Sequence, residues 1–71
     1  MNIRTELKNA KTVLFTDDEY FNKEITGVKS LVEIKDMFCI KGKLKLHSNV
    51  YNEYEYRLVG SEYRFTLTIL D

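Results

Sequence analysis

The sequence has no proline and no tryptophan, and it contains only one cysteine, one histidine and three glycines. The single cysteine, Cys39, can form neither an internal disulfide bond nor a thiolate zinc site, so a reducing cytoplasm is the expected compartment. The glycines are too scattered for a phosphate-binding loop or a dinucleotide-binding motif. The apolar runs are too short to span a membrane or to form a signal-peptide core. The composition therefore predicts a cytoplasmic chain without a membrane segment, cofactor or metal.

Neither sign of charge dominates the sequence. Eleven lysines and arginines balance eleven aspartates and glutamates, which gives a net charge of zero. Dedicated nucleic-acid binders usually carry excess positive charge, because the neutralisation of phosphates drives their affinity. A net charge near zero weakens repulsion between copies, and a chain of 71 residues buries an only marginally sufficient core. We therefore expect a single domain, 1–71, that a partner or a second copy stabilises.

Apolar residues recur at helical spacing near the N-terminus, at positions 3, 7, 10 and 14, with charged residues between them. This stripe predicts an amphipathic helix that ends near Lys11. The segment 12–16 is rich in residues that favour strands, and it predicts a short strand.

The segment 16–27 fits two structures. Thr16 and Glu19 have the spacing of a capping box, and the acidic residues between them suit the positive end of a helix dipole. A short helix that ends at Gly27 is the favoured interpretation. A turn followed by a strand is the alternative.

Two patterns also compete between residues 28 and 47. Ser30 and Glu33 have the spacing of a second capping box. Against a helix there, apolar residues alternate with charged ones over a long stretch. We therefore interpret 28–35 as a strand, Lys35-Asp36 as a bend, and 37–47 as a further strand.

The last third of the chain has the clearest alternation of apolar and polar residues. The two alternating runs, 53–58 and 63–69, are separated by Gly60-Ser61, which is typical of a type II′ hairpin turn. This turn pairs Tyr54 with Leu67 and Tyr56 with Phe65. All the apolar side chains of the hairpin then lie on one face of the sheet.

The loop length of the preceding hairpin is predicted from the same requirement, that the apolar side chains lie on one face of the sheet. A three-residue loop, 48–50, keeps the apolar residues on one side, whereas a two-residue loop, 48–49, would reverse them. The longer loop sets Lys43 opposite Glu55 and Lys45 opposite Glu53. It therefore predicts a ladder of ion pairs on the polar face.

Together these segments predict an α+β fold. An N-terminal helix, with or without a second short helix, would pack on an antiparallel β-meander of three to five strands. The tyrosines at 54, 56 and 63 are expected in the core. The alternative is a winged-helix arrangement, with 17–26 and 31–38 as the helix pair and 39–59 as the wing.

Three groups of reactive side chains have simpler interpretations than catalysis. Cys39 and His47 would lie about 26 Å apart along one strand, which is too far for a catalytic dyad. Glu53 and Glu55 have the spacing of a carboxylate pair, but facing lysines would keep both ionised. The acidic run 17–19 lacks the spacing of a calcium-binding loop. We therefore predict that the chain is not an enzyme.

The polar face of the sheet is the predicted binding surface. Arg57 and Arg64 would lie opposite each other there, which requires an acidic group nearby or one from a partner. A lysine-rich strand beside Tyr51 suits single-stranded nucleic acid, although the neighbouring glutamates would neutralise it. The predicted partner-binding residues are Lys41, Lys43, Lys45, Tyr51, Glu53, Glu55, Arg57 and Arg64.

The function expected from these features is a small protein-binding module that acts as a regulator, inhibitor or adaptor. A chain rich in lysine, asparagine, isoleucine and tyrosine suits an AT-rich genome, such as that of a bacterium, a phage or a mobile element. Self-association as a homo-oligomer is compatible with the small core. The alternative function is a nucleic-acid-binding regulator of the winged-helix or single-strand-binding type.

Overall fold

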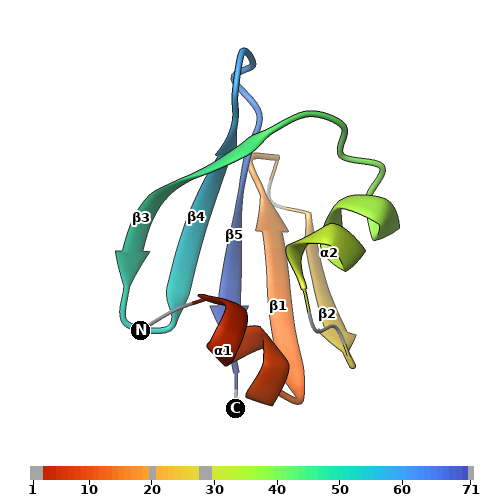
Figure 1. Ribbon diagram of the computed structural model, residues 1–71, viewed down its shortest axis with the longest axis vertical. Helices are drawn as coiled ribbons and strands as arrows, with labels where there is room; N and C mark the ends of the chain where they lie inside the picture. Colours follow the sequence, from red (N-terminus) through yellow and green to blue (C-terminus); the bar gives the residue numbers. More distant parts are fainter. Residues whose placement is uncertain (1–2, 20, 28–29, 71) are drawn as a thin grey trace.

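The computed structural model describes residues 3–19, 21–27 and 30–70. Each helix is followed along the described chain by a run of strands (Figure 1). Their order is α1 (Ile3–Asn9), β1 (Thr12–Asp17), β2 (Asn22–Thr26), α2 (Leu31–Met37), β3 (Leu44–Val50), β4 (Glu53–Leu58) and β5 (Arg64–Ile69).

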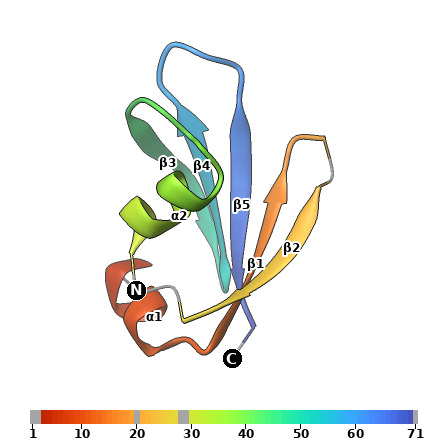
Figure 2. The same ribbon diagram turned by 90° about the vertical axis from the view of Figure 1, so that its right-hand side faces the viewer.

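The strands form one five-stranded sheet in the order β2-β1-β5-β4-β3. Every neighbouring pair is antiparallel. Both helices lie on the same side of this sheet, as Figure 2 shows from the side. The prediction of an α+β fold, with an N-terminal helix on an antiparallel meander, is therefore confirmed. No helix in the described ranges is both long and apolar enough to cross a membrane.

The core lies between the helices and the face of the sheet that they cover. Phe15 of β1 is its centre, because its ring stacks on Phe38 at 3.9 Å and on Phe65 at 5.1 Å between ring centroids. The buried residues are Leu7, Ala10, Val13, Phe15, Ile25, Ile34, Ile40, Tyr54, Tyr56, Phe65, Leu67 and Ile69. Tyr63 is partly buried against them, so the expected core position of the three tyrosines is confirmed.

The hairpin of β4 and β5 has the predicted register, with Tyr54 opposite Leu67 and Tyr56 opposite Phe65. Its turn differs from the prediction. The Ser61 N–H donates to the Leu58 carbonyl at 3.2 Å, and this hydrogen bond makes Val59 and Gly60 the central residues of the turn. The register survives because the connection still has an even number of residues, which leaves the alternation of faces unchanged.

The predicted helix over 16–27 is wrong, and the alternative of a turn followed by a strand is correct. Asp17 Oδ1 accepts hydrogen bonds from the N–H groups of Glu19 and Phe21, both at 2.9 Å. The carboxylate that suited a helix N-terminus therefore stabilises the turn between β1 and β2. Ile25 then lies opposite Val13 in β1 and is buried, which gives β2 a better apolar contact than a short helix would have.

The predicted strand over 28–35 is also wrong; residues 28 and 29 lie outside the described ranges. A complete capping box begins α2: the Ser30 hydroxyl accepts from the Glu33 N–H, and the Glu33 carboxylate accepts from the Ser30 N–H. The helix wins because it satisfies its own first turn and buries Ile34 completely. Lys35-Asp36, predicted as a bend, lies inside this helix.

The predicted strand over 37–47 begins only at Leu44. Cys39 has a φ of 56° and Gly42 a φ of 121°, and neither value is compatible with a strand. These residues belong to a connection that runs from α2 across the sheet to β3 (Figure 1). Glycine is favoured at position 42 because side chains rarely adopt a φ of 121°, and a Cβ atom would also approach Leu58 Cδ1 to 3.0 Å. A hydrogen bond from the Val59 N–H to the Lys43 carbonyl fixes the end of the connection beside β4.

The loop predicted at 48–50 is wrong as well. β3 continues to Val50, which pairs with Glu53 across a two-residue turn formed by Tyr51 and Asn52. A β-bulge between Leu46 and Ser48 makes this register consistent, because the extra residue changes the side on which the following residues lie. The winged-helix alternative is excluded, since 17–26 forms a turn and a strand and supplies no helix to pair with α2.

We predict that the buried and exposed faces of α2 differ sharply in their sensitivity to substitution. Ile34→Val should lower the free energy of unfolding by about 0.5–1.5 kcal/mol, because it removes a methylene from a filled site. Val32, with two-thirds of its side chain exposed, is the matched control, and Val32→Ala should change stability by less than about 0.5 kcal/mol. Urea denaturation measures both values. Equal costs would contradict the placement of α2.

We also predict that stability falls in alkaline solution because of the core tyrosines. Burial, assisted by the charge of Glu6, raises the pKa of Tyr54 above the ordinary 10.0. Burial likewise raises the pKa of Tyr56. Because the unfolded chain then loses these protons first, the contribution is complete below about pH 10 and is lost as the pH rises through the raised values.

The measurement is urea denaturation from neutral pH to about pH 11. Tyr54→Phe should weaken the alkaline loss of stability, since it removes one titrating core group. Tyr51→Phe is the matched control, because the Tyr51 side chain is 82% exposed. An identical alkaline decline in both variants would contradict the assignment.

Candidate functional site

The face of the sheet that neither helix covers is lined by polar side chains. We call it the open face, and the strand registers place on it the residues that alternate with the core positions. Its members are Thr12, Leu14, Thr16, Asn22, Glu24, Thr26, Lys45, Ser48, Val50, Glu53, Glu55, Arg57, Arg64, Thr66 and Thr68. Only Leu14 and Val50 among them are large and apolar, so this face is suited to polar contacts.

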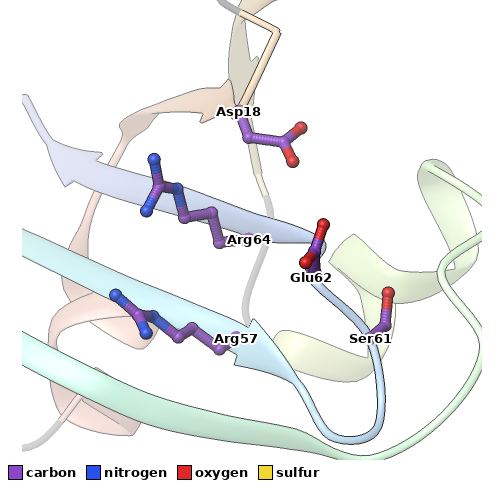
Figure 3. A pocket seen from close by; sticks show the side chains of 5 residues that line it. All are labelled: Asp18, Arg57, Ser61, Glu62 and Arg64. Carbon is purple, nitrogen blue, oxygen red and sulfur yellow. The ribbon is translucent and has the colours of Figure 1, made fainter.

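Three adjoining depressions make the open face concave between β1 and β3. The first lies over β3, β4 and β5 and is lined in part by Glu55 and Thr66. The second shares those two residues and extends to Asp18 and Arg64. The third shares Asp18 and Arg64 with the second, and Arg57, Ser61 and Glu62 complete its lining (Figure 3). The three depressions therefore adjoin one another through shared lining residues, and we call them together the hollow.

Three cations form a row at one end of this hollow. Lys45 of β3 lies opposite Arg57 of β4, and Arg57 lies opposite Arg64 of β5. All three side chains are exposed. Like charges directly opposite each other in a sheet are destabilising, so the row requires negative charge close by.

Among the described residues, an acidic side chain pairs with Arg57 but not with Arg64. Arg57 Nε lies 3.1 Å from Glu55 Oε2, which is a direct ion pair two residues along the same strand. Within 3–19, 21–27 and 30–70, the Arg64 guanidinium has neither a hydrogen bond nor an ion pair. Figure 3 shows the Arg57 and Arg64 side chains side by side, both directed away from Glu62 and Ser61.

The ladder of lysine–glutamate pairs predicted from the sequence does not form. Because of the β-bulge, Lys45 lies opposite Arg57 instead of Glu53, and Ser48 lies opposite Glu55. Lys43 precedes β3 in the connection from α2, so it is not opposite Glu55 either. The prediction failed because it started from a strand that was too long and a turn placed three residues too early.

The structure brings together five of the eight residues predicted to bind a partner. Lys45, Glu53, Glu55, Arg57 and Arg64 all belong to the open face. The other three lie elsewhere: Lys41 and Lys43 in the connection before β3, and Tyr51 in the β3–β4 turn.

Tyr51 lies beside a separate depression that Glu6 of α1 helps to line. The open face also contains residues that sequence reasoning missed. Thr16 and Asp18 line the hollow. The sequence did not predict this, because it favoured a helix over 16–27, whereas β1 continues to Asp17.

The described residues do not assemble a metal site. No three His, Cys, Asp or Glu side chains within the described ranges are clustered closely enough to hold a metal ion. Cys39 lies in the connection and His47 in β3, so the strand that would have contained both does not exist.

Comparison with known proteins finds no matching family model, and neither a curated protein nor a solved structure matches the chain significantly.

We predict that Arg64 lowers the stability of the isolated chain. Arg64→Gln should raise the free energy of unfolding by about 0.2–1 kcal/mol, because it removes a like charge opposite Arg57. The gain should shrink with added salt, which screens the repulsion. Arg57→Gln is the matched control and should gain less, since it also breaks the ion pair with Glu55. A loss of stability in Arg64→Gln would contradict this account.

Proposed function

We propose that the chain is a small, non-enzymatic, cytoplasmic module that binds another protein through the open face and acts as a regulator, inhibitor or adaptor. One observation carries the proposal: the uncovered face of the sheet is concave and presents Arg64 without an acidic partner among the described residues. Binding sites are commonly concave, with a small number of polar groups that fix the orientation of the ligand.

The size of the face supports a protein as the partner. The molecule measures 31 × 22 × 21 Å, and a single face of it can present on the order of 700 Å². A standard protein–protein interface covers about 800 Å² on each partner. One bound protein would therefore occupy most of the open face, including the whole hollow.

The position of the aromatic side chains favours a protein over nucleic acid. Proteins that bind single strands stack the bases on exposed aromatic rings above a basic track. No described residue of the open face is aromatic, because Tyr54, Tyr56 and Phe65 lie on the covered side. The exposed Tyr51 lies in the β3–β4 turn, and the acidic side chains of Glu53 and Glu55 interrupt the cations.

The polarity of the face favours a different protein over a second copy of the chain. Permanent homodimer interfaces are more apolar than the rest of the surface, with buried cores like those of single domains. The open face has only two large apolar residues, Leu14 and Val50, at separate strands. Such a surface suits a partner that binds and dissociates.

The experiment places a photo-reactive phenylalanine analogue at Thr68, in the middle strand of the open face, or at Val32 on the exposed side of α2. Each variant is irradiated in nuclease-treated native lysate and, separately, as the purified chain. We expect a discrete protein adduct from the Thr68 position and none from the Val32 position.

Matched charge reversals test whether the adduct depends on the open face. Arg64→Glu should abolish the adduct, whereas Lys23→Glu should preserve it, because Lys23 lies opposite Phe15 on the covered side. A protein adduct from Val32 alone would overturn the proposal. So would an adduct that nuclease removes, which would identify nucleic acid, or an adduct of doubled mass in the purified sample, which would identify a second copy.

A further inference from the structure

We infer that the pair of arginines on the open face binds a carboxylate side chain of the partner, so that the partner supplies an acidic segment to the hollow between β4 and β5. This inference rests on the proposed function and specifies its chemistry. It starts from an imbalance of charge: Lys45, Arg57 and Arg64 form one row, and within the described ranges only Arg57 of these three has an ion pair.

The two guanidinium groups offer a geometry that a carboxylate fits. A guanidinium presents its N–H donors in a planar fork that matches the two oxygens of a carboxylate. Glu55 contacts Arg57 at Nε, and all the donors of Arg64 are without an acceptor in the described residues. The two side chains extend in the same direction (Figure 3). An incoming carboxylate can therefore pair with Arg64 while it remains next to Arg57.

The acidic residues near the arginines are engaged or directed elsewhere. Asp17 uses Oδ1 to accept two backbone N–H groups of the β1–β2 turn. Asp18 and Glu62 line the same hollow, but in Figure 3 the Arg64 guanidinium extends away from both. The unmatched charge of Arg64 is therefore available to a partner.

The same acidic residues decide between a carboxylate and a phosphate. A carboxylate carries one negative charge, which balances the one unpaired guanidinium. A phosphate group carries up to two charges and would lie in a hollow that Glu55, Asp18 and Glu62 also line. Repulsion from these three groups disfavours the more highly charged group at the point of contact with Arg64, whatever the total charge of the ligand. The hydroxyl of Thr66, which lines the hollow beside Arg64, is a suitable donor to the second carboxylate oxygen.

The first experiment measures binding of simple probes to the purified chain. The Nε–H signals of the arginines are followed by nuclear magnetic resonance during titration with a hexaglutamate peptide, a hexaglutamine peptide or inorganic phosphate. We expect saturable shifts at Arg64 and Arg57 with hexaglutamate, at least about tenfold weaker binding of phosphate, and none of hexaglutamine.

Variants identify the group that is responsible. Arg64→Gln should weaken hexaglutamate binding by about tenfold or more, and Arg64→Lys should restore only part of it, because lysine lacks the planar fork. Lys23→Gln, which removes one charge from the covered side, should bind as the original chain does. Equal losses in Arg64→Gln and Lys23→Gln, or tighter binding of phosphate than of hexaglutamate, would overturn the inference.

The second experiment separates this inference from the proposed function. The Thr68 cross-link is repeated with Arg64→Gln, and the partner residue closest to the cross-linked position is identified by peptide mapping. Thr68 lies about 13 Å along β5 from Arg64, so we expect an aspartate or glutamate within a few residues of the mapped position. Its replacement by arginine should restore the cross-link to Arg64→Glu. An undiminished adduct in Arg64→Gln would overturn the carboxylate inference and leave the protein-binding proposal standing. Absence of any protein adduct from the original chain would remove the proposed function itself.

Discussion

The stacking of Phe15 between Phe38 and Phe65 is the contact on which the rest of the structure depends. It joins three parts that are distant in the sequence: β1 of the first hairpin, the end of α2, and β5 of the C-terminal meander. β1 can pair with β5 only if its buried face matches that of β5, and Phe15 opposite Leu67 meets this condition. Once the two hairpins are joined, both helices are confined to one side, because their apolar residues must reach the same core. The open face on the other side is a consequence of this arrangement.

The sequence predicted the parts of the fold that depend on neighbouring residues. The β4–β5 hairpin was predicted in its correct register, because a short connection and strict alternation of faces leave few other solutions. Segments with two consistent local patterns were assigned wrongly. Ser30 and Glu33 have the spacing of a capping box, but the alternation over the following residues favours a strand. The helix prevailed because the core required Ile34 and because Cys39 and Gly42 end the extended pattern through their positive φ values. Those constraints come from tertiary contacts that no local pattern contains.

The candidate site was predicted in part for the same reason. Glu55, Arg57 and Arg64 were placed correctly on one face, since their positions follow from the β4–β5 register. The partners of Lys45 were not, because a β-bulge depends on how two strands fit over the core. The sequence predicted a neutral ladder of lysine–glutamate ion pairs on this face. The structure instead has a row of three cations, in which Arg57 pairs with Glu55. The sequence correctly predicted that Arg57 and Arg64 lie opposite each other. In the structure Glu55 pairs with Arg57, whereas no described residue pairs with Arg64.

The residues around Arg64 indicate whether an arginine at this position stabilises the isolated chain. The next two open-face positions of β5 are threonines, Thr66 and Thr68, which favour strands and carry no charge. A third threonine would continue this pattern and would avoid the repulsion from Arg57, so the stability of the isolated chain does not account for Arg64. The repulsion is small compared with the roughly 5–15 kcal/mol of a typical folded domain, so the fold can tolerate it. Our proposal accounts for a side chain that weakens the free protein slightly and has no acceptor among the described residues, because it supplies that acceptor from a partner.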